Sequence, residues 1–208
     1  MKAIVAANGG SDLIYVPNGS KETVQKIVER LLGYDYIGGI FVDDKFGAIP
    51  GTLPLNAINL AAFSSLPRPA IAVAFKVFYS NYKDLQTAFQ ISDTQLEEGQ
   101  GMHGGFGRDS TYNNMAAIGP DFKHGYADEA PVSNADIVPT LARLLGLDFK
   151  AKGKLKGRIV NEAIEGAPDA LPTQTRQLVS EPANGMRTVL DYLEFANERY
   201  SNGPASQR

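Results

Sequence analysis

The chain has 208 residues, of which 43% are apolar and 21% charged, with a net charge of −3 and no cysteine. This length accommodates one sizeable core, and the lack of cysteine excludes disulfides, thiolate metal ligands and a cysteine nucleophile. The slightly acidic balance argues against nucleic acid as a partner. No apolar run reaches the roughly 20 residues that cross a bilayer, and residues 1–13 lack the apolar core of a signal peptide.

The N-terminal part predicts a β-hairpin followed by a helix. Residues 2–7 and 13–16 are short apolar runs around an Asn-Gly-Gly turn, which favours a hairpin. Ser20 is a suitable N-cap for a helix that ends at Gly33 or shortly after it. Its apolar residues recur at spacings of three and four and are expected to pack on a sheet. They are Val24, Ile27, Val28, Leu31 and Leu32.

Three further segments are predicted to be strands. Residues 68–78 are apolar on both faces at their start, which is typical of a central strand covered on both sides. Residues 36–44 predict a second buried strand, and residues 115–122 a third. The proline-punctuated stretch 47–55 between the first two predicts a loop.

The C-terminal part predicts helices over residues 133–147 and 186–200. Gly146 is the expected stop of the first, and Pro139 fits its first turn if that helix begins near Asp136. The basic stretch 147–158 predicts a solvated loop, residues 155–166 a strand-like stub, and residues 201–208 a disordered tail. The helix residues expected to face the core are Ile137, Leu141, Leu144 and Leu145.

The alternation of strands and helices indicates an α/β layered domain. No internal repeat or linker divides the sequence, so residues 1–200 are expected to form one domain. The opening hairpin is unusual, because such sheets more often begin with a strand, a loop and a helix.

Few residues carry recognisable chemistry. His103 lies among the glycines of residues 99–107, and glycine is used where backbone must approach something closely. Asp43 and Asp44 end a predicted strand, where α/β proteins place ligand-binding groups, although a solvated turn is the more ordinary interpretation. His124 is expected on the surface. A triad of Ser110, His103 and Asp109 is disfavoured, because such triads are assembled from distant positions.

Four motifs resemble, in combination and in order, the C-terminal part of the alkaline phosphatase superfamily. They are GMHG (101–104), NNMAAIGPDFKHG (113–125), APVSNADIVPTLARLLGL (130–147) and LKGRIVNEA (155–163). The similarity is closest to the type I phosphodiesterase and nucleotide pyrophosphatase branch. Residues 3–17 and 51–59 also resemble the region just upstream in bacterial members.

The resemblance implies hydrolysis of phosphate mono- or diesters by two metal ions, usually zinc, with a Thr or Ser nucleophile. It implies a partial α/β/α layered sheet, and it places His103 at a metal ligand beside which glycines let the backbone approach. The family's Asp-x-x-x-His and Asp-His motifs, which supply most other ligands, do not occur in the chain. The resemblance therefore implies the C-terminal portion of a hydrolase, inactive without an N-terminal half or companion chain. Family members are often exported to the periplasm, so the location stays open.

Three functions compete on this basis. The first is the C-terminal portion of a phosphoesterase, which predicts an exposed apolar patch on the face of the sheet where the missing strands belong, and a tendency to associate. The second is a non-catalytic binding or structural module, which predicts a monodisperse protein with cooperative unfolding. The third is an unrelated enzyme with a mononuclear metal site made of Asp43, Asp44 and His103.

Overall fold

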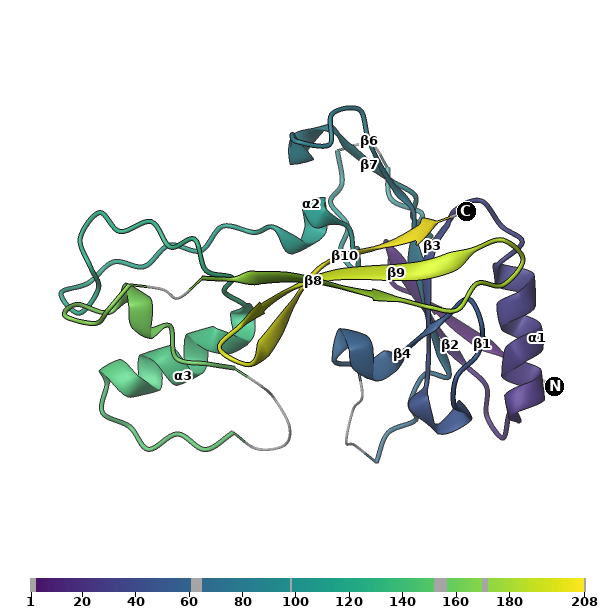
Figure 1. Ribbon diagram of the computed structural model, residues 1–208, viewed down its shortest axis with the longest axis horizontal. Helices are drawn as coiled ribbons and strands as arrows, with labels where there is room; N and C mark the ends of the chain where they lie inside the picture. The colour runs from purple at the N-terminus through teal and green to yellow at the C-terminus, as the bar shows by residue number, and fades with distance from the viewer. Residues whose placement is uncertain (1–2, 61–64, 98, 152–156, 170–171, 208) are drawn as a thin grey trace. The chain divides into compact units, whose positions relative to one another are not determined.

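The computed structural model describes residues 3–60, 65–97, 99–151, 157–169 and 172–207 (Figure 1). Where the sequence predicts one domain, the chain divides into two compact units, which are described separately. Unit 1 comprises Met1–Asn113, Gln177–Asp191 and Ser201–Arg208, and unit 2 comprises Asn114–Arg176 and Tyr192–Tyr200. Helices and strands are mixed, which places the chain in the general α/β class. None of the described helices is long and apolar enough to span a membrane.

A five-stranded sheet forms the centre of unit 1. The predicted hairpin is confirmed: β1 (Ile4–Ala7) and β2 (Ser11–Tyr15) pair antiparallel. The strand order is β1-β2-β5-β3-β4, with every pair antiparallel except β3 with β4. The remaining strands are β3 (Ile37–Val42), β4 (Leu53–Pro54) and β5 (Ile71–Phe75).

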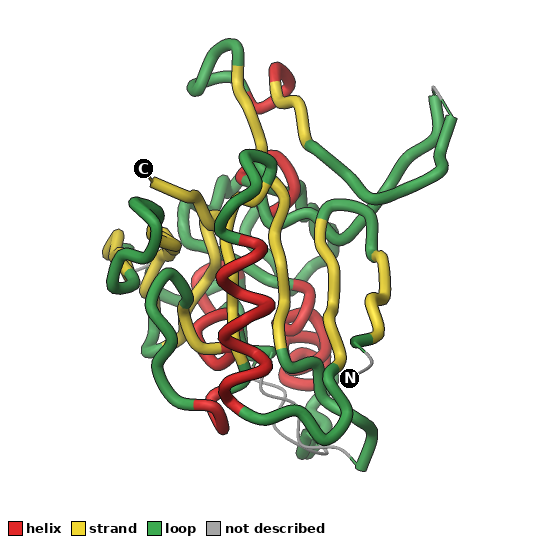
Figure 2. The backbone as a smooth tube through the Cα atoms, turned by 90° about the vertical axis from the view of Figure 1, so that its right-hand side faces the viewer, coloured by secondary structure: helices red, strands yellow, loops and turns green. Residues whose placement is uncertain are grey.

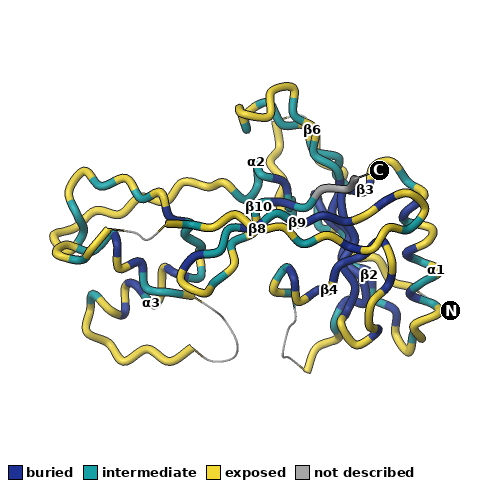
Figure 3. Tube along the Cα trace, in the orientation of Figure 1, coloured by how far each residue is buried: buried dark blue, intermediate teal, exposed yellow. Residues whose placement is uncertain are grey.

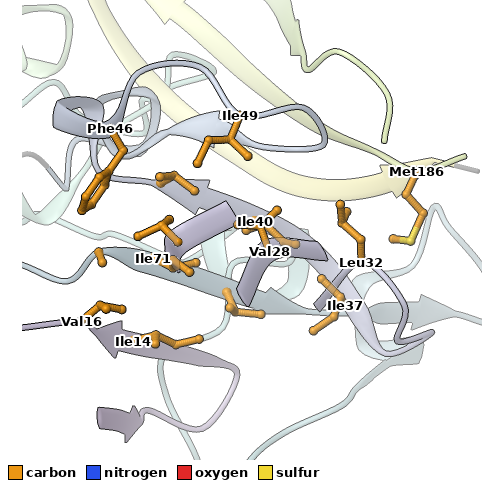
Figure 4. Packing of buried hydrophobic residues seen from close by; sticks show 14 of the residues in the cluster. Ile14, Val16, Val28, Leu32, Ile37, Ile40, Phe46, Ile49, Ile71 and Met186 are labelled. Atoms are coloured by element: carbon orange, nitrogen blue, oxygen red, sulfur yellow. The ribbon is translucent and has the colours of Figure 1, made fainter. Parts of the chain in front are cut away.

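The predicted central strand is confirmed as β5, in which every residue is buried. Helix α1 (Lys21–Leu31) lies across one face of the sheet, as Figure 2 shows, and the Ser20 hydroxyl caps it by accepting the Thr23 N–H at 3.3 Å. Val28 of α1 packs on Ile40 and Ile71 of β3 and β5 (Figure 4). A second cluster, which includes Phe41 and Leu190, covers the other face. The central strands are therefore dark blue in Figure 3.

Short elements complete unit 1 around this sheet. The strands β6 (Val77–Tyr79) and β7 (Ala88–Gln90) form a separate antiparallel hairpin. The helix α2 (Arg108–Thr111) follows the glycine-rich segment that carries His103. The 3₁₀ turns are η1 (Asp44–Phe46), η2 (Leu55–Ile58) and η3 (Leu85–Thr87).

The helix predicted over residues 186–200 is wrong. These residues form most of a β-hairpin, because β9 (Arg187–Phe195) and β10 (Glu198–Gln207) flank a two-residue turn. Ala196 and Asn197 both have positive φ, at 51° and 64°, as a tight hairpin turn of the primed type requires. Residues 201–207, predicted to be a disordered tail, continue β10. With β8 (Gln174–Val179) the strands form a sheet ordered β10-β9-β8.

The strand predicted over residues 115–122 does not form. Figure 1 draws the segment between α2 and α3 as a loop. Among the described residues, an isolated bridge joins Phe122 to Ile164. Within the described residues, the backbone of residues 115–118 has no hydrogen-bonded partner, and Ile118 is 99% exposed. The apolar sequence is typical of a strand, but it joins no sheet here. Of the basic stretch 147–158, residues 152–156 lie outside the described residues.

Unit 2 contains α3 (Asn134–Leu144) and η4 (Asn161–Ala163). Gly146 ends the helix as predicted, with φ +65°, but Pro139 lies in the second turn because the helix begins at Asn134. The predicted inward face is wrong: Ile137, Leu141 and Leu145 are 40%, 47% and 70% exposed, and Leu144 is half-buried. The buried side chains of the helix are Asp136, Thr140 and Ala142.

Candidate functional site

His103, the predicted metal ligand, lies with its side chain exposed in the loop before α2. Its carbonyl oxygen accepts the Gly10 N–H at 3.2 Å, which fastens the loop to the turn between β1 and β2. The backbone around the imidazole is therefore fixed while the imidazole itself stays accessible.

The glycines beside His103 allow two segments of the backbone to lie close together. Gly104 has φ +82°, and a Cβ there would overlap the carbonyl oxygen of Asn8. Gly9, on the facing turn, has φ +74°, and its Cβ would lie 2.5 Å from the His103 carbonyl oxygen. The sequence predicted a close approach here, but to a metal site. The structure shows that the partner of this approach is the turn of the first hairpin.

Replacing Gly104 by alanine is expected to destabilise unit 1 by about 2–3 kcal/mol, because it combines backbone strain with an overlap. Gly99→Ala is a matched control, since φ is +84° there but no atom lies near the added Cβ. It should cost only about 1 kcal/mol, the backbone part of the effect. Gly101 has open space and no positive φ, so Gly101→Ala should be neutral. Urea denaturation of the three variants checks this order, and equal losses for Gly99→Ala and Gly104→Ala would contradict it.

Asp43 and Asp44 are held by local structure at the end of β3. Asp43 is 1% exposed, and its Oδ1 accepts the Lys45 N–H at 3.2 Å, which begins η1. The Asp43 carboxylate also lies 3.5 Å from Arg68 and 3.7 Å from Lys45. Asp44 is exposed and accepts the Asn56 N–H at 3.2 Å. The two cations beside Asp43 oppose the binding of a further cation there.

The described residues contain no group of three or more His, Asp or Glu side chains that could hold a metal, so Asp43, Asp44 and His103 are not brought together. Ser110 donates to Asp109 at 3.4 Å and Asp109 accepts the Tyr79 hydroxyl at 3.3 Å. Neither residue has a hydrogen bond to His103 among these contacts, so the triad is not formed. His124 is exposed, as predicted.

In unit 2, the motif residues form a buried polar network. The Asp136 carboxylate accepts the Ser133 N–H and the Arg158 N–H, both at 2.8 Å, and the Tyr200 hydroxyl at 3.3 Å. Thr140 donates to the Asp136 carbonyl at 2.6 Å and accepts the Val160 N–H at 3.0 Å. The network therefore joins the first turns of α3 to the segment that follows Gly157.

Arg158 extends this network to two further segments. Its guanidinium donates to Glu162 at 2.9 Å, to the Tyr200 hydroxyl at 2.8 Å and to the Pro131 carbonyl at 3.0 Å. Burial raises the pKa of Tyr200 to about 12, so its hydroxyl stays a donor across the physiological range. These contacts satisfy buried polar groups and occupy the guanidinium. Arg158 and Asp136 therefore hold these segments of unit 2 in place, and the polar atoms of their side chains are engaged in these contacts and not directed at a ligand.

Sequence reasoning missed Tyr200 and Glu162 as members of this network. Tyr200 comes from a hairpin that the sequence predicts as a helix, 64 residues after Asp136. Glu162 had a local signal, because it stands four residues after Arg158. The searches of known protein families, curated proteins and solved structures found no match to the chain.

Proposed function

We propose that the chain is the C-terminal portion of a metal-dependent phosphoric ester hydrolase, a phosphodiesterase, nucleotide pyrophosphatase or phosphatase of the alkaline phosphatase type. In this proposal the chain is inactive alone. An N-terminal portion supplies the nucleophile and most metal ligands, and completes a layered sheet. His103 supplies one ligand from an exposed position on a fixed loop.

The apolar face of α3 is the observation that carries this proposal. Ile137, Leu141 and Leu145 follow the spacing of a core-facing stripe, and yet they are exposed. Exposed apolar patches of this kind mark surfaces that another polypeptide covers. The segment 115–118, whose sequence is typical of a buried strand, is likewise exposed and unpaired among the described residues. Both features are expected of a portion that folds against missing structure.

The metal requirement is consistent with a missing portion. A catalytic zinc takes about three protein ligands and keeps one position for water or substrate. His103 provides one of them, and no group of three metal-binding side chains occurs within the described ranges. The described residues therefore do not fit a complete zinc site by themselves. Bound zinc would lower the pKa of the attacking group and polarise the phosphoryl oxygens.

The network of unit 2 favours a second candidate, a non-catalytic binding or structural module. Asp136, Thr140 and Arg158 carry the family resemblance, and all three make buried structural contacts. A chain could keep these residues for the scaffold alone. The exposed apolar face of α3 distinguishes the two candidates, because a self-contained module has no reason to maintain it.

Substituting Leu141→Lys and Leu145→Lys together is expected to reduce self-association and dye binding to exposed apolar surface. The free energy of unfolding should change by less than about 0.5 kcal/mol per site, because both side chains are exposed. Gln95→Lys with Asn114→Lys adds the same charge at exposed polar positions and should leave association unchanged. Sedimentation velocity over a range of concentrations measures this. A wild-type chain that is monomeric throughout would favour the module.

A further inference from the structure

In the described part of unit 1, α1 covers only part of one face of the sheet. The helix packs on β3 and β5, and the sheet continues beside it through β2 and β1, the two strands next to the N-terminus in Figure 2. A groove of about 390 Å³ borders these two strands and the last turn of α1. Val5 of β1, which lines the groove, is 55% exposed. The apolar lining includes Val5, Ile14, Leu31, Ile37, Val73 and Ile91.

The width of the uncovered strip fits one further helix. Neighbouring strands lie about 4.8 Å apart, so β2 and β1 extend the sheet by roughly 10 Å beyond β5. Helices that pack side by side have their axes about 8–10 Å apart. A helix placed next to α1 therefore lies over β2 and β1, in the layer that α1 begins.

The segment 91–93 bounds one end of the groove. The Ile91 N–H donates to the Lys76 carbonyl at 3.0 Å, and the Asp93 N–H donates to the Gly9 carbonyl at 2.9 Å. Both acceptors lie at the same end of the sheet, where β5 ends and β1 turns into β2. A helix that fills the groove therefore meets this segment at one of its ends.

The groove also contains two carboxylates. Asp12 of β2 and Asp93 both line it. Among the described residues neither forms an ion pair, and Asp12 Oδ1 is buried without a hydrogen-bond donor. Covering an unpaired carboxylate is costly unless the covering element brings a cation. The charge of the groove therefore complements a basic side chain.

We propose that this groove is the docking site of one amphipathic α-helix, whose apolar stripe covers Val5, Ile14 and Ile91 and whose lysine or arginine pairs with Asp12 and Asp93. The inference rests on the proposed function, since the N-terminal portion is the source of the helix. The apolar lining requires the stripe, the width of the strip requires a helix, and the carboxylates require the basic residue. An acidic residue at the same place brings like charges together, so the groove discriminates against it.

A cysteine introduced into the groove gives a unique attachment point for probe peptides, because the chain has none of its own. Val5→Cys places a thiol in the groove, and Ile4→Cys places one on the opposite face of the same strand, at a residue that is 49% exposed. Three synthetic helical peptides share an apolar stripe and one cysteine, and carry lysine, glutamine or glutamate at one position beside the stripe. A fourth peptide is the lysine peptide with its sequence scrambled. Mass spectrometry measures the mixed disulfides formed with the full chain in a glutathione redox buffer.

Val5→Cys should capture the lysine peptide on the order of tenfold better than the glutamate peptide, because repulsion replaces attraction. The glutamine peptide should lie between them, and the scrambled peptide should be captured equally by Val5→Cys and Ile4→Cys. Asp12→Asn and Asp93→Asn, each added to Val5→Cys, should reduce the preference for lysine over glutamate. Asp93 is exposed, so its replacement does not disturb the packing of the sheet.

Equal capture of the lysine and glutamate peptides by Val5→Cys would overturn the inference. So would equal capture of the lysine peptide by Val5→Cys and Ile4→Cys, or a preference for lysine that persists when both aspartates are replaced. The peptide assay needs no hydrolysis. Selective capture beside an inactive complex with the N-terminal portion would retain the docking groove and refute the hydrolase, and hydrolysis by that complex with unselective capture would do the reverse.

Discussion

Replacing Asp136 by alanine is expected to destabilise unit 2 by about 3–5 kcal/mol. Asp136 is 1% exposed and accepts from Ser133, Arg158 and Tyr200. Alanine removes the acceptor and leaves buried donors without a partner. It also removes the carboxylate of the capping box that begins α3.

Two other variants separate these contributions. Asp136→Asn keeps one oxygen but places an amide N–H₂ among donors, so it should lose less stability than alanine and more than a surface change. Asp148→Ala removes an exposed carboxylate of the same unit, whose ion pair with Lys150 is 3.7 Å long and exposed. It should change stability by less than about 0.5 kcal/mol. Hydrogen exchange of peptides from α3 measures the three variants, and a loss for Asp136→Ala no larger than that for Asp148→Ala would contradict the network.

Local patterns in the sequence predicted much of unit 1. The Asn-Gly-Gly turn predicted the first hairpin, and Ser20 with the stripe through Val24 and Val28 predicted α1. Residues 68–78 are apolar on both faces, which only a central position satisfies, and β5 occupies it. In each case the signal and the structure that it predicts lie within a few residues of each other.

The failures occurred where a pattern depended on distant partners. Residues 186–200 combine helical spacing with residues that favour strands, and the turn at Ala196 and Asn197 decides between them. The stripe of α3 predicted a buried face, but burial depends on a covering surface from elsewhere, and Ile137, Leu141 and Leu145 are 40%, 47% and 70% exposed. Residues 115–118 have the composition of a strand, but they pair with none of the strands in the described part of the chain.

The candidate site, too, was predicted from the sequence only in part. The glycines around His103 predicted a close backbone approach, and the approach to Asn8 is observed. The sequence could not identify the facing backbone, because Asn8 is nearly a hundred residues from the loop. Asp136 and Arg158 belong to two of the motifs that carry the resemblance. The hydrogen bond from the Arg158 backbone N–H to the Asp136 carboxylate, at 2.8 Å, gives a physical reason for their spacing.

The second large effect concerns activity. Co-expression with an N-terminal portion that carries the Asp-x-x-x-His and Asp-His motifs is expected to produce phosphate ester hydrolysis that requires zinc. In that complex, His103→Ala should lower kcat/KM by more than about 100-fold, because loss even of a residue that only supports a metal ligand costs 10–100-fold. His124→Ala is the matched control, an exposed histidine of unit 2, and should retain full activity.

The most direct test of the central claim is hydrolysis by the chain alone. Purified wild type and His103→Ala would be given zinc and assayed with p-nitrophenyl phosphate and with bis-p-nitrophenyl phosphate. The proposal predicts no turnover above the zinc blank for either protein with either ester. Turnover by the wild type that disappears in His103→Ala would contradict it, because the chain would then build a working metal site from its own residues.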